Sequence, residues 1–387
     1  MFKKSLAAVA VLGAFAGSAF AAEVTMYGVI DTGLMYTYED VADGDATTDL
    51  EQHTLGLEGG INSSNRFGVK GTEELGNGMK VGFTLENGFE SDTGALKTKD
   101  TLFDREASVS LYGDFGTLSM GRMGGVGSGA GTYDLVLATA DAFDGGDNNV
   151  FGFATSDRYD NMVTYQTPSF SGFQATVQYS LNESSVDNTK RENSSQVDRY
   201  LGLALTAELG AFQSVLAYET QNYASFGDKA QANTEDGQVV YLGGNYDFGV
   251  TRLFAMAQYF KGLSATQLTA IADETRAETA DNMWSDGAKG YGLHLGTVTP
   301  VFGGDFTAGL YFVDAKFQNG ANAANQNDAD LSYYGAALRY GYPLSKRTTV
   351  YTGVGYGVSK LEFNNNGQDV EAKNQVGQAY LGLTHMF

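Results

Sequence analysis

The sequence predicts an all-β fold, a 16-stranded antiparallel transmembrane β-barrel, and three observations support this. Segments of about ten residues alternate between apolar and polar side chains, which is the period of a β-strand with one apolar face. Short and long connections follow one another strictly, seven short and eight long, so that fifteen connections join sixteen strands. An even number of strands, with short turns at one end and long loops at the other, is typical of a membrane-spanning β-barrel.

The first strand shows the alternation clearly. Val24, Met26 and Ile30 fall on one face, while Tyr27 and Asp31 fall on the other. The same pattern returns in segments within residues 80–89, 116–122, 160–167, 173–181, 199–209, 212–220, 239–248, 252–260, 291–298, 306–317, 332–342 and 349–359. The last strand is expected at residues 379–387, where it would close the sheet against the first strand so that no edge is left unpaired in lipid.

The connections fall into two classes by length. The short ones are predicted at 74–78, 113–116, 169–172, 209–211, 247–250, 302–305 and 343–346. The long polar ones are predicted near 39–62, 91–101, 124–156, 183–197, 223–236, 263–288, 319–330 and 362–373. All long loops therefore lie at one end of the barrel, which a soluble sandwich with a dry core would not require.

Proline and the aromatic residues fit this arrangement. Pro168, Pro300 and Pro343 lie at or beside short turns, as expected if strand interiors are fully paired. Phenylalanines also gather at these turns, where an interfacial girdle would run. The strands contain much glycine and little continuous apolar sequence, which favours a polar, water-filled interior over a packed core. The phenylalanines at the turns are Phe115, Phe170, Phe248 and Phe302.

Composition excludes several classes of protein. Cysteine is absent, so neither disulfides nor thiolate metal sites are possible. The formal net charge of −22 disfavours nucleic acid as a partner, because nucleic-acid binding depends on Lys and Arg that neutralise phosphates. Glycine-rich disordered chains are poor in aromatic residues, whereas 12% of this chain is aromatic.

The first 21 residues resemble a secretory signal peptide. Two lysines precede an apolar stretch from Leu6 to Phe20, and Ala19 to Ala21 form a small-residue cleavage site. The apolar stretch is short for a membrane-spanning helix of about 20 residues, so an N-terminal anchor is the weaker alternative. We therefore expect residues 1–21 to be removed after Ala21 or Ala22 on export and residues 22–387 to form one barrel domain.

Five segments are informative as whole stretches, in this order along the chain: "EVTMYGVIDTGL" (23–34), "SSNRFGVKGTEELGNGMKVGFTLENGF" (63–89), "FDREASVSLYGDFGTLSMGR" (103–122), "RYDNMVTYQTPSFSGF" (158–173) and "GLTHMF" (382–387). They resemble the general diffusion porins of Gram-negative bacteria, most closely the betaproteobacterial and neisserial branch. The resemblance implies a trimer of 16-stranded barrels in the outer membrane, with short periplasmic turns, long extracellular loops and the third long loop folded into each pore. It also implies passive diffusion of small hydrophilic solutes and ions, not an enzyme. The terminal Phe387 resembles the aromatic residue recognised by outer-membrane assembly machinery.

The resemblance also implies a charged constriction, in which acids of the third long loop face a basic wall and select ions by sign and size. The candidate acids are Asp134, Asp141, Asp144 and Asp147. The candidate basic residues are Arg66, Arg105 and Arg158, with Arg122 as a weaker fourth. The alternative is that these side chains are solvated or form ion pairs that serve stability alone.

Strand parity tests the basic candidates. Arg66 alternates with Phe67, and Arg158 shares its face with polar residues, so both are expected to point inward. Arg105 shares its parity with the apolar Val109, and a β-bulge or a strand that faces a trimer interface would remove that conflict.

Other acids bear on ion preference. Asp31 is expected to face the lumen in the first strand, where some relatives carry a basic residue. A group of acids in the first long loop would make the pore mouth negative and shift its preference towards cations, unless these acids serve only solubility. They are Glu39, Asp40, Asp43, Asp45, Asp49 and Glu51.

No cofactor or metal site is predicted. His53, His294 and His385 are isolated in the sequence, and no acidic cluster has calcium-loop spacing, although loop acids could bind cations that bridge lipopolysaccharide. The alternatives to a general porin are a substrate-specific channel on the same barrel, an adhesin or receptor barrel and, least favoured, a barrel enzyme.

Overall fold

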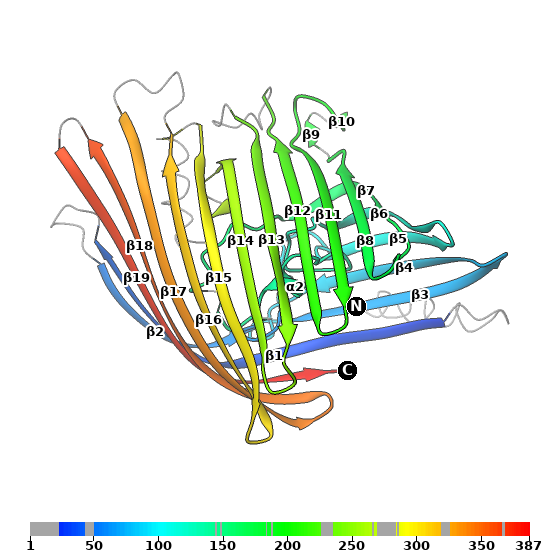
Figure 1. Ribbon diagram of the computed structural model, residues 1–387, viewed down its shortest axis with the longest axis horizontal. Helices are drawn as coiled ribbons and strands as arrows, with labels where there is room; N and C mark the ends of the chain where they lie inside the picture. Colours follow the sequence, from blue (N-terminus) through cyan, green and yellow to red (C-terminus); the bar gives the residue numbers. More distant parts are fainter. Residues whose placement is uncertain are drawn as a thin grey trace, which may run out of the picture.

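The computed structural model describes residues 23–42, 50–143, 145–147, 149–182, 184–186, 189–225, 235–264, 267–268, 284, 286–318, 326–365 and 368–387. The predicted signal peptide therefore lies outside the described residues. Most of the strands form one antiparallel sheet that closes on itself (Figure 1). The strands are β1 Glu23–Ala42, β2 Leu50–Gly59, β3 Arg66–Gly76, β4 Met79–Gly88, β5 Glu106–Gly113, β6 Gly116–Gly124, β7 Arg158–Gln166, β8 Phe173–Ser180, β9 Ser184–Val186, β10 Thr189–Arg191, β11 Arg199–Leu209, β12 Phe212–Asn222, β13 Gly237–Asp247, β14 Arg252–Leu263, β15 Ala288–Val301, β16 Gly304–Phe317, β17 Gln326–Ser345, β18 Thr348–Asn365 and β19 Gln368–Met386.

The prediction of sixteen strands around the barrel is confirmed. Strands β2 and β3 both pair with β1, β2 along its second half and β3 along its first half, so they are two segments of the second strand. Strands β9 and β10 pair only with each other in a separate hairpin. The remaining strands pair in chain order, with β8 against β11 and β19 against β1.

The end of the chain closes the barrel as predicted. Strand β19 pairs with β1 in a continuous antiparallel register from Val29 opposite Met386 to Ala42 opposite Lys373. Phe387 continues this pairing, because its N–H donates to the Gly28 carbonyl at 3.0 Å and its carbonyl accepts from the Gly28 N–H at 3.1 Å. The last residue is therefore held by the first strand.

Two of the predicted long connections are shorter than expected. Residues 39–62 were expected to form a polar loop, but β1 continues to Ala42 and residues 50–59 form β2. Residues 362–373 were expected to form another, but β18 and β19 continue pairing as far as Asn365 opposite Gln368. Polar residues form these strand ends because cross-strand backbone hydrogen bonds do not require apolar side chains.

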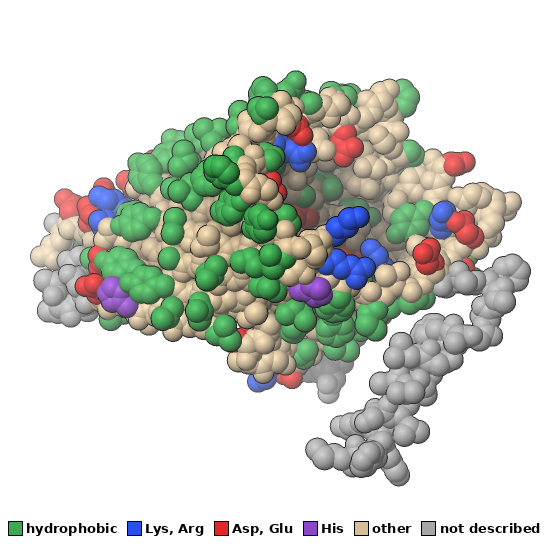
Figure 2. Space-filling view, turned by 90° about the horizontal axis from the view of Figure 1, so that it is seen from below, with side chains coloured by type: hydrophobic (Ala, Val, Ile, Leu, Met, Phe, Trp, Pro, Cys, Tyr) green, Lys and Arg blue, Asp and Glu red, His purple; other side chains and the backbone are tan. Residues whose placement is uncertain are grey.

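The alternation of exposed and covered side chains follows the predicted faces. In β1, Met26 and Ile30 are exposed, whereas Asp31 is buried. Hydrophobic side chains cover much of the outer surface in Figure 2. The four phenylalanines at the short turns are exposed as well. An apolar outer surface with exposed aromatic residues at its edge suits contact with lipid.

The interior is not only polar. The connection between β6 and β7, residues 125–157, folds into the barrel and carries the short helix α2 (Leu137–Ala140) (Figure 1); we call it the inward loop. Its apolar residues, among them Val136 and Phe153, pack on apolar side chains of the inner face of β11–β17. A polar, water-filled interior was expected to fit better than a packed core, but on this side the interior is apolar and packed, because the loop brings an apolar face of its own. Within the described residues, no helix has the length and apolar character needed to cross a membrane.

Candidate functional site

Three adjoining spaces in the hollow of the barrel, as far as the described residues line them, share Gly60. One of about 450 Å³ is lined by Asp134, Asp141, Arg252 and Arg339. A second of about 330 Å³ is lined by Lys97, Asp104, Arg105 and Arg158, and a third of about 300 Å³ by Glu58 and Gln378. Figure 2 shows the opening from the short-turn side, with Lys and Arg side chains gathered around it. We call the inner face of β3–β7, which carries the four predicted arginines, the arginine wall.

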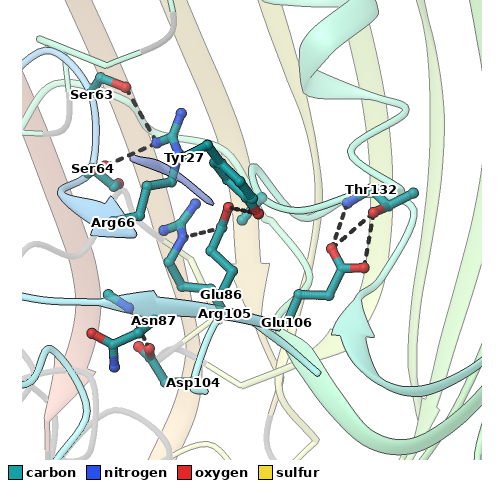
Figure 3. A network of polar contacts seen from close by, with 12 residues as sticks. Tyr27, Ser63, Ser64, Arg66, Glu86, Asn87, Asp104, Arg105, Glu106 and Thr132 are labelled. Atoms are coloured by element: carbon teal, nitrogen blue, oxygen red, sulfur yellow. Dashed lines mark hydrogen bonds and ion pairs between the residues drawn. The ribbon is translucent and has the colours of Figure 1, made fainter. Parts of the chain in front are cut away.

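Arg66 begins strand β3. Its guanidinium donates to the Ser64 carbonyl at 2.9 Å and to the Ser63 hydroxyl at 3.3 Å (Figure 3). No carboxylate of the described residues forms an ion pair with it. Neutral acceptors hold the side chain in place, so its positive charge is not cancelled by a direct partner.

Arg105 lies one residue before β5, so the alternation of that strand does not apply to it. Its side chain is 9% exposed and its Nε donates to Glu86 Oε1 at 2.6 Å (Figure 3). Glu86 also accepts a hydrogen bond from the Tyr27 hydroxyl at 2.9 Å. The apparent parity conflict therefore needs neither a β-bulge nor an interface, but the charge of Arg105 is largely compensated by Glu86.

Arg122 and Arg158 also differ in whether a carboxylate pairs with the guanidinium. Arg122 forms an ion pair with Asp160 at 2.7 Å and also donates from Nε to the Asp104 carbonyl at 2.8 Å. Arg158 has no ion pair within the described part of the chain, and its buried Nε has no hydrogen-bond partner there. Arg66 and Arg158 are thus the two predicted arginines with uncompensated charge.

The predicted loop acids lie in three different environments. Asp134 borders the largest space, where its Oδ1 accepts the Ala138 N–H at 3.1 Å. Asp141 lies 3.2 Å from Nε2 of the buried His294. Asp147 is 3% exposed and accepts a hydrogen bond from the Tyr311 hydroxyl. Asp144 lies outside the described residues. Asp141 and Asp147 therefore attach the inward loop to β15 and β16, and Asp147 borders the largest space but exposes little of its surface there.

Burial changes the protonation of Asp147. Desolvation raises the pKa of this carboxyl group from 3.8 to about 7, and the nearby negative charge of Asp141 acts in the same direction. The hydrogen bond from Tyr311 and the charge of Arg339 oppose the shift. A group with this pKa carries only part of its negative charge at neutral pH.

Asp31 is fully buried, and its expected role as a lumen charge is not supported by its contacts. Its carboxylate accepts hydrogen bonds from the hydroxyls of Tyr351, at 2.7 Å, and of Thr384. The Asn62 N–H donates to it at 3.2 Å. The side chain faces inward as predicted, but the turn at residues 60–65 covers it. Among the first-loop acids, Glu39, Asp40 and Glu51 lie on strands, and the other three are outside the described residues.

Two inward-facing residues were missed by the sequence analysis. Arg339 of β17 donates to Asn62 Oδ1 at 2.6 Å and to the Gly145 carbonyl at 2.8 Å. Glu219 of β12 is 4% exposed and accepts hydrogen bonds from the Gly127 N–H at 2.9 Å and from the hydroxyls of Tyr200 and Tyr241 at 2.6 and 3.0 Å. The signal was available, because a charged residue on the inward parity of an alternating strand is unusual unless it has a partner.

We call the inner face of β11–β18, on which the inward loop is fixed, the anchor wall. It holds the base of the loop through Glu219 and the middle through His294. The tip is held by Tyr311, by Arg339 and by the Tyr333 hydroxyl, which donates to the Val150 carbonyl at 2.5 Å. Among the described residues, no group of three His, Asp or Glu side chains is arranged to hold a metal ion.

Comparisons with known proteins agree with this geometry. A family model described as Gram-negative porin matches residues 7–383. An outer membrane porin protein of Bordetella pertussis is 32% identical over 373 residues, which cover 90% of this chain and 92% of the relative. The outer membrane porin protein 32 of Delftia acidovorans is 34% identical over 67% of this chain and 70% of its own length.

Solved structures show the same fold at lower identity. An anion-selective porin from Comamonas acidovorans superposes with a TM-score of 0.62 at 24% identity, over 95% of this chain and all of that one. A loop-deletion mutant of the outer membrane protein OmpT of Vibrio cholerae gives a TM-score of 0.59 at 15% identity, over 95% of this chain and 99% of the other.

Proposed function

The chain belongs to the family of Gram-negative porins, and from this premise we propose that its constriction favours anions over cations. It is an outer-membrane channel through which small hydrophilic solutes and ions diffuse passively. What the family does not decide is the sign of the ions that pass more easily, which depends on the charges that line this particular lumen.

The observation that carries the proposal is the imbalance on the arginine wall between arginines without an ion-pair partner and carboxylates that are either paired with an arginine or buried. Arg66 and Arg158 have no ion-pair partner among the described residues, whereas Glu86 and Asp160 each bind an arginine. Asp104, which also borders the arginine wall, forms no ion pair within the described residues, but it is buried and accepts the Gly88 N–H at 2.7 Å and the Thr98 hydroxyl at 3.1 Å, so it presents little of its carboxylate to the lumen. In a narrow lumen with walls of low dielectric constant, uncompensated charges concentrate ions of the opposite sign.

We propose the following roles for the predicted site residues. Arg66 and Arg158 attract anions, and Arg105 and Arg122 contribute less because each is paired with a carboxylate. Asp134 is the described loop acid that faces the permeating ion across the hollow. Asp141 and Asp147 act by fixing the inward loop, and the role of Asp144 stays a prediction.

An asymmetric salt gradient across a planar bilayer tests the selectivity. We expect wild-type channels to give a reversal potential of the anion-selective sign. We expect Arg66→Gln with Arg158→Gln to lower the anion-to-cation permeability ratio by roughly twofold or more, because even a fraction of a kcal/mol of attraction per charge changes local ion concentrations by such factors. The matched control is Arg347→Gln, which removes an exposed arginine at a short turn. A reversal potential unchanged by the double substitution, or already of the cation-selective sign, contradicts the proposal.

We also propose that three chains form a homotrimer whose outer surface contacts lipids and lipopolysaccharide, and that assembly machinery recognises Phe387. Support comes from the exposed apolar outer residues and from Phe387, whose backbone is fixed by Gly28 while its side chain stays exposed. Deletion of Phe387 is expected to lower the amount of folded protein in outer membranes, and its normal insertion would contradict the recognition. If light scattering shows that the folded protein has the mass of a single chain, the proposed trimer is contradicted.

A further inference from the structure

The second strand of the barrel is interrupted in an unusual way at residues 60–65. These residues separate β2 from β3 and belong to neither segment. Asn62 nevertheless contacts Arg339 of β17 at 2.6 Å. In the order β17, β18, β19, β1 and β2, the two residues are four strand positions apart, which is about 19 Å along the wall at the usual strand spacing of about 4.8 Å. The turn must therefore leave the wall and cross the inner face of the strands between them.

The inner face of β1 and its neighbours holds this turn firmly. The Asn62 N–H donates to Asp31 Oδ1 at 3.2 Å, and Asn65 Oδ1 accepts the Asp31 N–H at 2.6 Å. Asn62 also donates to the Thr384 hydroxyl of β19 at 3.2 Å. Ile61 is buried in a cluster with the inward-facing Tyr351 and Tyr380. The buried carboxylate of Asp31 thus fixes the turn inside the barrel.

The turn touches the inward loop directly. The Arg339 guanidinium bridges the two, since it donates to Asn62 Oδ1 and to the Gly145 carbonyl. The backbones approach so closely that a β-carbon on Gly145 would lie 2.5 Å from the Asn62 carbonyl oxygen. Gly145 also has a φ of 125°, which side-chain-bearing residues rarely adopt. This contact therefore depends on a glycine at the tip of the loop.

We propose that residues 60–65 are a second constriction element, which together with the inward loop sets the cross-section of the pore, and that Arg339 is the positioning residue that joins the two. Gly60 borders all three spaces of the hollow, and the exposed Ser64 borders two of them. Ser63 and Ser64 also hold the guanidinium of Arg66, so the element connects pore size with the position of an uncompensated charge. The inference rests on the channel function proposed above, but not on the sign of its selectivity.

The absence of cysteine permits a direct test. Ser64→Cys is a nearly isosteric change at an exposed position. A bulky, charged methanethiosulfonate reagent added to open channels of this variant should lower single-channel conductance by roughly half or more. The reason is that the group attached to the cysteine occupies a narrow part of the pore. Thr93→Cys is the matched control, since Thr93 is exposed in the β4–β5 connection and lines none of the three spaces. Equal, small effects at both positions overturn the inference while leaving the channel itself intact.

A second pair of variants tests the positioning role of Arg339. Arg339→Gln, which cannot span Asn62 and Gly145, should raise the size limit for neutral polymers that enter the pore, and Arg339→Lys should restore part of the wild-type limit. A merely structural role would lower thermal stability without moving the size limit, and that result overturns the assignment. The size limit for neutral polymers also tests the second constriction element if Ser64→Cys gives no channels. If folded wild-type protein fails to conduct, that result contradicts the channel function instead.

Discussion

The arginine wall and the anchor wall follow the same strand alternation, yet their inward residues perform different tasks. On the arginine wall, charged side chains border open space, and two of the four arginines have no ion-pair partner among the described residues. On the anchor wall, Glu219, His294 and Tyr311 are buried beneath the inward loop. An inward charge is therefore informative about permeation only where the loop does not cover it.

Glu86 and Glu219 make the comparison precise. Each is a buried glutamate that accepts a tyrosine hydroxyl, Glu86 from Tyr27 and Glu219 from Tyr200. Glu86 binds a second side chain of its own wall, Arg105, whereas Glu219 binds the backbone of the inward loop at Gly127. The contact between Glu86 and Arg105 reduces the net charge at the lumen, and the contact between Glu219 and Gly127 fixes a loop that fills part of the pore.

The largest effect is expected from Glu219→Ala. Three donors would lose their acceptor, and a buried donor left without a partner costs about 1–3 kcal/mol. We expect the base of the inward loop to detach, so that the midpoint of thermal unfolding falls and single-channel conductance becomes higher and noisier. Circular dichroism on heating and bilayer recordings measure the two effects.

Glu86→Gln is the matched substitution on the other wall. It leaves Arg105 without a charged partner, so the anion preference should rise while the conductance and its noise change little. If Glu219→Ala also changed only selectivity, or if Glu86→Gln detached the inward loop, the distinction between the two walls would be lost.

A smaller effect is expected from pH at the anchor wall. The pKa of Asp147 is raised to about 7 by burial, so the folded state binds this proton more tightly than the unfolded chain. The stabilisation is complete below the unfolded value of 3.8 and is lost as the pH rises through about 7. We expect amide protection in the inward loop, corrected for intrinsic exchange rates, to be lower at pH 8 than at pH 5.

Asp147→Asn separates this group from the rest of the anchor. An amide cannot ionise but can still accept the Tyr311 hydrogen bond, so it should remove most of the difference between the two pH values. The groups around Asp147 include Asp141, His294, Tyr311, Tyr333, Arg339 and Tyr380. If the variant keeps the full pH dependence, one of these groups is responsible instead.

The sequence by itself determined the strand number, the inward and outward faces and the closure of Phe387 against the first strand. These features are local, because alternation with a period of two residues identifies each strand and a short turn identifies each hairpin. The family resemblance also located the arginines and the loop that folds inward. It did not reveal that β1, β18 and β19 extend through polar segments, because backbone pairing alone sustains them.

Only the tertiary structure decided which charges remain available to an ion. Asp31 and Tyr351 are 320 residues apart in the chain, and Arg339 and Asn62 are 277 apart, yet they meet because the barrel closes. Parity places a side chain on the inner face but cannot say whether a loop or turn covers it there. The turn at 60–65, the burial of Asp147 and the pairing of Arg105 with Glu86 all depend on contacts that form only when distant strands come together.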